Sequence, residues 1–324
     1  MPSRRETAVY VSGVRKTFGK VEALRGISFQ ADRGTVLGIL GPNGAGKTTT
    51  VKILSTLLRP DSGTATVAGH DVIRHAADVR RSIMMTGQYA AVDVTMTGRE
   101  NIVLFGRLMG LGKRHARRRA DELLEQFDLV EASDRSIKEY SGGMRRRVDL
   151  ACGLVVRPEV VFLDEPTTGL DPRSRQTIWN LVANLREQRI TVLLTTQYLE
   201  EADLLSDNII VIDHGTVIAE GSADQLKAMI GGSYCDVVPL HPQELARTVA
   251  ALGDLVPASV SAEVLGSESR DHISIPAPYG PATLAEALRR LDAAGIALTD
   301  IGLRRPSLDD VFLNITGPAA PSAP

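Results

Sequence analysis

GPNGAGKT, residues 41–48, is the stretch of this sequence that decides the fold. It fits the pattern G-x-x-x-x-G-K-[ST], with the strand-like run TVLGIL (35–40) before it and the helical pattern KTTTVKILSTLL (47–58) after it. Glycines let backbone N–H groups converge on an anion without an intervening Cβ, and the positive end of the following helix adds to the attraction. The stretch therefore predicts a phosphate-binding loop. The residues expected to bind are Gly41, Pro42, Asn43, Gly44, Ala45, Gly46, Lys47, Thr48 and Thr49.

Two side chains of this loop suit a nucleotide with its metal ion. Lys47 should reach the β- and γ-phosphates, and the Thr48 hydroxyl should ligate Mg²⁺. A glycine-rich turn before a helix would explain the glycines, but it would not explain Lys-Thr in the required register. The loop is therefore interpreted as a nucleotide site rather than as a simple turn.

A second apolar run, VVFLDE (160–165), ends in two carboxylates. A carboxylate at the end of a buried strand is costly unless it meets a cation or hydrogen-bond donors, so Asp164 is expected to hold Mg²⁺ through water. Glu165 comes next and points differently, which suits a base that orients or deprotonates the attacking water. Together with the phosphate loop, this pair predicts a P-loop NTPase.

The kind of NTPase is not decided by these parts. A small GTPase would carry an Asn-Lys-x-Asp motif, which the sequence lacks, and a nucleoside kinase would need a second-substrate site that we do not identify. The deciding stretch is YSGGMRRRVDLACGLVVRPEVVFLDEPTTGLDP, residues 140–172. It resembles the ATP-binding subunits of ABC transporters, and the resemblance covers roughly residues 8–230.

This resemblance implies a dimer and assigns further residues. Ser141, Gly142 and Gly143 match the family's signature motif, which closes over the γ-phosphate held by the partner subunit. The resemblance therefore implies a head-to-tail homodimer with ATP at the interface. Asp171 matches the loop that passes between the two subunits of this dimer. Gln88 matches the glutamine that contacts Mg²⁺ and links the ATP site to a membrane partner. Phe18 matches the aromatic side chain that stacks on adenine.

Gln197, in TTQYLEEAD, departs from the family pattern, which usually has a histidine there that reaches the γ-phosphate. Glutamine offers a donor NH₂ and an acceptor C=O at a similar reach, but it can carry neither a charge nor a shuttled proton. The substitution favours Glu165 over Gln197 as the proton acceptor. We expect Gln197, Glu165 and Lys47 to be the catalytic residues, although a degenerate, inactive site stays open.

Composition and charge bound the other possibilities. The chain has 324 residues, a hydrophobic content of 43% and a net charge of −2, so nothing biases it globally towards nucleic acid, and no nucleic-acid partner is expected. Its two cysteines, Cys152 and Cys235, fit a reduced cytosolic compartment. No apolar run approaches the ~18 residues of a membrane-spanning helix, so a membrane role would need another chain.

The pattern along the chain predicts two domains of different kinds. Apolar strands alternating with helices up to about residue 230 predict an α/β ATPase domain with a largely parallel sheet, residues 8–230. A helical insert is expected over about 97–158, beginning at a capping box in which Thr97 is the N-cap and Glu100 follows three residues later. Residues 235–317 predict a small α+β accessory domain without catalytic groups, and 318–324 a disordered tail.

The C-terminal stretch SLDDVFL predicts a helix with an apolar stripe made of Leu308, Val311, Phe312 and Leu313. The stripe either closes the core of the accessory domain or supports contacts with the ATPase dimer or a permease. KRHARRRADEL (113–123) leaves two interpretations as well: a contact with anionic lipid or an acidic permease loop, or a solvated helix face.

Further motifs narrow the family. MMTGQY, SGGMRRR, GLDPRSR, TTQYLEEAD and RRPSLDDVFLNITG resemble the daunorubicin/doxorubicin-resistance type of ABC ATPase, so the resemblance extends over 8–317. It implies an ATP- and Mg²⁺-dependent ATPase that powers drug efflux through a separate membrane permease, from the cytoplasmic face of the cell membrane. The alternatives are a nucleotide-gated regulatory subunit that scarcely hydrolyses ATP and a soluble ABC ATPase of translation or DNA repair.

Overall fold

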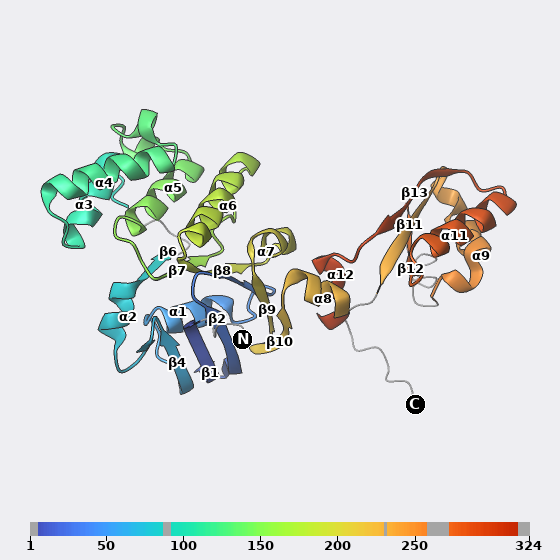
Figure 1. The fold of residues 1–324 in the computed structure, drawn as a ribbon, viewed down its shortest axis with the longest axis horizontal. Helices are drawn as coiled ribbons and strands as arrows, with labels where there is room; N and C mark the ends of the chain where they lie inside the picture. Colours follow the sequence, from blue (N-terminus) through green and yellow to red (C-terminus); the bar gives the residue numbers. More distant parts are fainter. Residues whose placement is uncertain (1–5, 87–91, 230–231, 258–271, 317–324) are drawn as a thin grey trace. The chain divides into compact units, whose positions relative to one another are not determined.

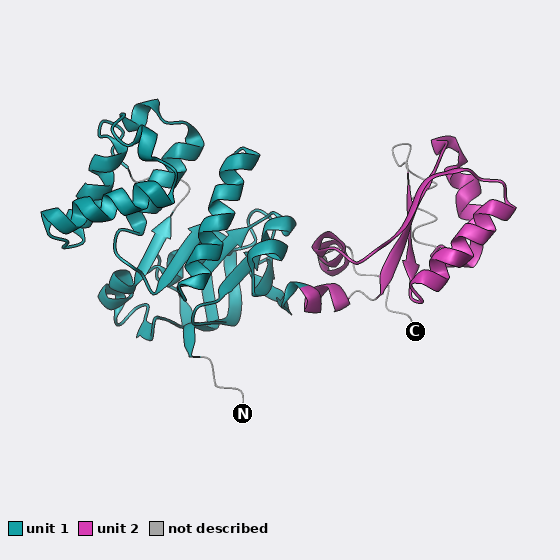
Figure 2. Ribbon diagram, turned by 45° about the horizontal axis from the view of Figure 1, so that its top comes forward, with its two compact units in different colours: residues 1–223 teal, residues 224–324 magenta. Residues whose placement is uncertain are grey.

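The computed structural model describes residues 6–86, 92–229, 232–257 and 272–316. The chain divides into two compact units, Met1–Ala223 and Asp224–Pro324, which are coloured separately in Figure 2. Gln88 and the tail 318–324 lie outside the described residues. Among the helices that the structure describes, none has the length and apolar character needed to cross a bilayer.

The centre of unit 1 is a six-stranded sheet in the order β10-β9-β3-β8-β7-β6 (Figure 1). Its strands are β3 (Val36–Leu40), β6 (Ile83–Thr86), β7 (Val160–Asp164), β8 (Thr191–Thr196), β9 (Asn208–Asp213) and β10 (Thr216–Gly221). All neighbours pair in parallel except β9 and β10. Along β7, Val161 and Leu163 join one core cluster, whereas Val160 and Phe162 join another. Both faces of the sheet are therefore covered, which confirms the α/β prediction.

A second, antiparallel sheet in unit 1 has the order β2-β1-β4-β5. Its strands are β1 (Thr7–Phe18), β2 (Val21–Asp32), β4 (Ser62–Val67) and β5 (His70–Asp71). Val9 and Val11 of β1 share a core cluster with Leu37 and Ile39 of β3 and Val51 of α1. Helix α1 and the phosphate loop are thus fixed on an apolar layer between the two sheets. The alternation of apolar runs did not predict this second sheet.

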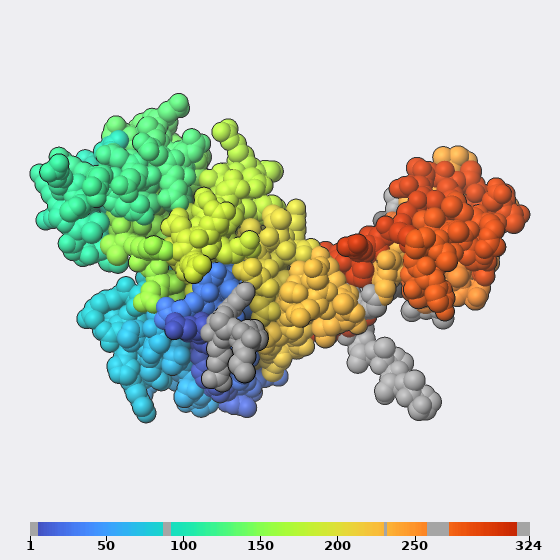
Figure 3. All heavy atoms as spheres, viewed as in Figure 1, coloured from blue at the N-terminus to red at the C-terminus, as the bar shows by residue number. Residues whose placement is uncertain are grey.

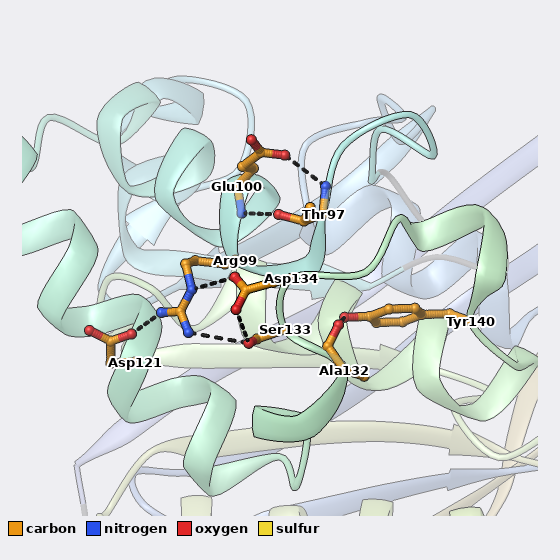
Figure 4. Close-up of polar contacts among 8 residues, drawn as sticks. All are labelled: Thr97, Arg99, Glu100, Asp121, Ala132, Ser133, Asp134 and Tyr140. Atoms are coloured by element: carbon orange, nitrogen blue, oxygen red, sulfur yellow. Dashed lines mark hydrogen bonds and ion pairs between the residues drawn. The ribbon is translucent and has the colours of Figure 1, made fainter.

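The helices of unit 1 fall into two groups. Those adjoining the sheets are α1 (Lys47–Leu54), α2 (Ala76–Ser82), α6 (Pro172–Glu187) and α7 (Leu199–Leu205). The others form the helical segment after β6: α3 (Gly98–Leu108), α4 (Lys113–Gln126) and α5 (Gly142–Gly153), with 3₁₀ turns at Val130–Ala132 and Ile137–Glu139. Thr97 and Glu100 form the predicted capping box, each side chain accepting from the other's backbone N–H, at 3.1 and 2.9 Å (Figure 4).

One arginine joins three parts of the helical segment. The Arg99 guanidinium pairs with Asp121 on α4, donates from Nε to Asp134 at 3.0 Å and reaches the Ser133 hydroxyl at 3.2 Å (Figure 4). The Tyr140 hydroxyl donates to the carbonyl of Ala132 at 2.6 Å. These contacts fix the loop that leads into α5.

Unit 2 contains a three-stranded antiparallel sheet in the order β12-β11-β13. Its elements are α8 (Ala223–Met229), whose first residue belongs to unit 1, β11 (Ser233–Pro239), α9 (Leu245–Leu252), β12 (Ile273–Ala277), α11 (Pro281–Ala293), β13 (Leu298–Arg304) and α12 (Leu308–Thr316), with 3₁₀ turns at Pro242–Glu244 and Gly253–Leu255. Side chains of α9 and α11, among them Leu252 and Leu291, pack with Val237 and Ile275 of the sheet. This apolar cluster is the core of the unit.

Helix α12 is the helix that SLDDVFL predicts, but its buried stripe is narrower than expected. Leu308 and Val311 are buried, at 3% and 2% exposure, whereas Leu313 is 70% exposed. The i, i+5 spacing from Leu308 to Leu313 turns the latter away from the buried side. Leu308 and Val311 are not part of the core cluster on the three-stranded sheet.

Candidate active site

The phosphate loop lies between the end of β3 and the start of α1 and depends on two of its glycines. A Cβ on Gly41 would stand 2.2 Å from the carbonyl oxygen of Ile212. Gly46 has a φ of 113°, and a Cβ there would stand 2.8 Å from the carbonyl oxygen of Ala23. Side chains at either position would displace backbone, so the loop conformation requires glycine there.

Lys47 is buried, at 4% exposure, and its ammonium group is held on the inside of the loop. Nζ donates to the carbonyl oxygens of Gly41 at 2.8 Å and Pro42 at 3.1 Å, and it lies 3.4 Å from Oε1 of Glu165. The ammonium group can exchange these partners for phosphate oxygens without leaving the loop. A phosphate would then separate Lys47 from Glu165 as a counterion and free the carboxylate for another partner.

Asp164 is the buried carboxylate at the end of β7, at 2% exposure. Its Oδ1 accepts from the hydroxyls of Thr195 at 2.6 Å and Thr48 at 3.2 Å. Mg²⁺ in nucleotide sites is held by one or two protein oxygens together with phosphates and water. Thr48 and Asp164 fit that need. No cluster of three or more His, Cys, Asp or Glu side chains suited to a metal occurs in the described part of the chain.

Glu165 adopts a backbone conformation that a glutamate rarely takes, with φ at 47°. A non-glycine residue in this region costs about 1–2 kcal/mol. Its amide N donates to the carbonyl oxygen of Thr195 at 3.1 Å and to the hydroxyl of Thr195 at 3.0 Å, which holds the strained turn. The turn aims the carboxylate back towards Lys47. Strain of this kind is typical of functional positions.

Glu165 lines two cavities. The smaller, of about 240 Å³, contains the phosphate loop, and its lining is Ala23, Asn43, Gly44, Gly46, Lys47, Thr48, Thr49 and Glu165. The larger, of about 670 Å³, adjoins the start of α5, and its lining is Val92, Val94, Gly142, Arg145, Arg146, Glu165, Pro166, Thr168, Gly169 and Leu170. The glutamate thus stands between the phosphate loop and the Ser-Gly-Gly turn.

The Ser-Gly-Gly turn caps α5. The Ser141 hydroxyl accepts from the amide of Met144 at 3.2 Å. A Cβ on Gly143 would stand 2.2 Å from Oγ of Ser174, so α5 approaches α6 closely there. Asp171 caps α6 by accepting from the amide of Ser174 at 2.8 Å. Hydrogen bonds from the side chain and the amide of Ser174 hold the pKa of Asp171 below its usual range.

The structure brings some of the predicted residues together and leaves others apart. Gln197 follows β8 directly, and β8 pairs with both β3 and β7, so Gln197 lies at the edge where Asp164 ends its strand. Phe18 is at the end of β1, 49% exposed, with the Lys16 ammonium 5.6 Å from its ring centroid. It is not in the lining of either cavity.

Two polar residues of this region were not predicted. Thr195 contacts both Asp164 and Glu165, and the only sequence signal is a pair of hydroxyls ending the apolar run of β8. Arg146, on α5, donates to the Thr86 hydroxyl at 3.2 Å and lies 3.6 Å from the Asp149 carboxylate. Burial lowers the pKa of Arg146. In the sequence, Arg146 is the middle one of three consecutive arginines, and nothing in the pattern distinguishes it from the other two.

Comparisons with known proteins agree with this geometry. Residues 24–168 match the family model described as "ABC transporter". The chain is 60% identical, over 96% of its length and 94% of the relative's, to the doxorubicin resistance ATP-binding protein DrrA of Mycobacterium tuberculosis. It is 47% identical, over 96% of its length and 92% of the relative's, to the daunorubicin/doxorubicin resistance ATP-binding protein DrrA of Streptomyces peucetius.

A solved structure supports the fold of unit 1. The dimeric, post-hydrolysis structure of the ATP-binding cassette MJ0796 bound to ADP and Pi superposes with a TM-score of 0.61 at 25% identity. The match covers 66% of this chain and 98% of that one.

Proposed function

This chain belongs to the ABC transporter family, and from that premise we propose that it is the ATP-hydrolysing subunit of a drug exporter. The observation that carries the proposal is the convergence of Lys47, Thr48, Asp164 and Glu165 around the phosphate loop. Each group matches a step of phosphoryl transfer to water, and relatives named for doxorubicin or daunorubicin resistance supply the class of cargo.

The chemistry assigns one task to each group. Backbone N–H groups of 41–48 and the Lys47 ammonium bind the phosphates of ATP, and their charge stabilises the transition state. Thr48 and Asp164 would hold Mg²⁺, which would supply positive charge to stabilise the phosphates. Glu165, released from Lys47 by the incoming phosphate, accepts a proton from the attacking water.

Gln197 occupies the position at which other members of the family usually have a histidine that reaches the γ-phosphate. Its amide NH₂ donates to a γ-phosphate oxygen and its C=O accepts from the attacking water, so it orients both reactants. It transfers no proton. Hydrolysis therefore relies on Glu165 as the base, and Gln197 contributes by positioning.

Assembly follows from the second half of the site. Ser141, Gly142 and Gly143 form a helix N-terminus with little side-chain bulk, suited to a γ-phosphate that is held by a second copy of the chain. We expect a head-to-tail homodimer that encloses ATP, with Asp171 at the subunit boundary and Phe18 against the adenine. Gln88 would contact Mg²⁺ and the membrane partner.

The membrane part is assigned to a separate permease. None of the helices in the described part of the chain could span a bilayer. The subunit would act as a peripheral protein on the cytoplasmic face of the cell membrane. For residues 235–317, which belong to unit 2, we propose a role in assembly, with α12 as the contact element.

A transport assay tests this function. Inverted membrane vesicles that contain the chain and its permease should take up doxorubicin when Mg-ATP is added, as followed by quenching of the drug's fluorescence. The matched control carries Lys47→Ala, which removes the phosphate-binding charge while leaving the membrane part unchanged. Equal uptake by both preparations would contradict the proposal.

A further inference from the structure

A buried carboxyl lies behind the segment that carries Gln197. Glu201, on α7, is 1% exposed, and Trp179 of α6 donates from Nε1 to its Oε1 at 3.2 Å. Burying a polar group of this kind costs several kcal/mol unless hydrogen bonds or charges compensate. An apolar side chain would fill the same space without this cost. Packing alone therefore does not explain why a carboxyl group, rather than an apolar side chain, is buried at position 201.

The surroundings of Glu201 are polar on several sides. Burial is the largest influence on the pKa of the Glu201 carboxyl and raises it. The opposite, smaller effect comes from the hydroxyls of Thr196 and Thr167, the Trp179 indole and the charge of Arg175, all of which lower this pKa. Oε2 of Glu201, Oγ1 of Thr167 and Nε of Arg175 are buried without a well-formed hydrogen bond. A hydrogen bond from the Thr167 hydroxyl to the Glu201 carboxylate would satisfy two of these atoms at once.

The partners of Glu201 belong to the segments that carry the hydrolytic groups. Thr167 is two residues after Glu165, in the loop that precedes α6, and its carbonyl oxygen accepts from the amide of Leu170 at 3.1 Å. Thr196 directly precedes Gln197, and its hydroxyl accepts from the amide of Tyr198 at 3.0 Å. Glu201 therefore stands where these two segments meet α6.

We propose that Glu201 is a positioning residue of the hydrolytic site, tying the segment of Gln197 to the loop that follows Glu165. This rests on the ATPase function proposed above. Its contacts reach α6, the end of β8 and the loop after β7, whereas the loop before α1 is the proposed phosphate site. Loss of Glu201 therefore slows the hydrolytic step more than it weakens ATP binding.

Three single variants of the full chain isolate this role. Glu201→Ala removes every contact and should lower kcat about tenfold or more, since misplacing reacting groups is costly, while KM for Mg-ATP stays within about twofold. Glu201→Gln keeps the acceptor for Trp179 and adds an NH₂ donor for a threonine hydroxyl, so it should restore kcat to within about threefold of wild type. Glu200→Ala, an exposed neighbour on the same helix, is the matched control and should behave as wild type.

A second readout does not depend on turnover. Trp179 is the only tryptophan of the chain, so its emission reports on the indole contact with Glu201. Glu201→Ala should shift that emission and speed amide hydrogen exchange at 166–170 and 196–199, with exchange at 41–49 unchanged. Glu200→Ala should change neither.

The two readouts separate the possible failures. A Glu201→Ala variant with wild-type kcat and wild-type exchange overturns the proposal, as does a Glu201→Gln variant that is as slow as the alanine variant. If the wild-type chain binds Mg-ATP without hydrolysing it, the proposed function fails instead. In that case, amide hydrogen exchange at 166–170 and 196–199 tests the role of Glu201 by itself. If exchange there is the same in Glu201→Ala as in the wild-type chain, Glu201 is not a positioning residue.

Discussion

The two units of this chain differ in what they bury. In unit 1, Lys47, Asp164, Thr195 and Glu201 are at most 4% exposed, and the first three gather where β3, β7 and β8 end or lead into a helix. In unit 2, the core cluster consists of apolar side chains and Cys235. Its buried polar side chains, within the described residues, are Thr248 and Thr283.

This difference indicates which unit carries chemistry. Buried ionisable groups cost free energy of folding, so a fold retains them where their charge acts on a ligand or on one another. Unit 1 combines such groups with a strained glutamate at Glu165. The core of unit 2 carries no comparable set among its described residues.

The largest expected effect comes from removing the central cation of unit 1. Lys47→Ala should lower ATP hydrolysis by on the order of 10³-fold or abolish ATP binding, because the β/γ-phosphate charge loses its main partner in the loop. Phosphate release and nucleotide-binding titrations measure the two effects. Normal turnover in this variant would refute the assignment of the phosphate loop.

A smaller effect is expected at the proposed base. Glu165→Gln should keep ATP affinity and slow hydrolysis by ~10² or more, since the proton acceptor is lost while the shape is kept. Bound ATP should then trap the dimer, which gel filtration with Mg-ATP detects. A monomer that persists under these conditions would argue against closure of two subunits over ATP.

Gln197 should contribute less than Glu165. Gln197→Ala removes one donor and one acceptor near the γ-phosphate and should lower kcat about tenfold, whereas Gln197→His should retain activity because the imidazole can also donate. Steady-state rates across pH 6 to 8 compare the three proteins. If the alanine variant matches wild type, Gln197 is not part of the site.

The smallest effect on hydrolysis is expected from unit 2. Leu291→Ala opens a cavity in its core and should destabilise that unit by about 2–5 kcal/mol, with ATP hydrolysis by unit 1 unchanged within about twofold. Deleting residues 235–324 should likewise leave ATP binding intact while weakening drug resistance with the permease.

These two changes test separate claims about unit 2. Full resistance in the deleted protein would remove the proposed assembly role of unit 2. If the protein that lacks residues 235–324 stays folded but cannot bind ATP, unit 1 does not bind ATP independently of unit 2.

The sequence predicts the contiguous parts of the site better than the parts that depend on folding. Gly41 to Thr48, Asp164 and Glu165 can be found because each motif joins a strand end to a loop or helix in one stretch of chain. Thr195 and Glu201 act through contacts with residues about 20 to 35 positions away, so their burial is invisible before the sheet and α6 are assembled.

The second unit shows the same limit. The periodicity of α12 predicts a helix, and burial of Leu308 and Val311 follows it. Leu313, five residues after Leu308, lies on another side of the helix and is 70% exposed. An apolar side chain alone does not specify that environment.

Single-turnover hydrolysis shows whether this site hydrolyses ATP through Glu165 although Gln197 replaces the usual histidine. Enzyme in excess over radiolabelled Mg-ATP should convert the bound nucleotide to ADP and phosphate in the wild-type chain, and the Glu165→Gln variant should retain it as ATP over the same time. Wild-type protein that holds ATP unhydrolysed for as long as the variant does would rule out hydrolysis through Glu165 and favour a nucleotide-gated regulatory subunit.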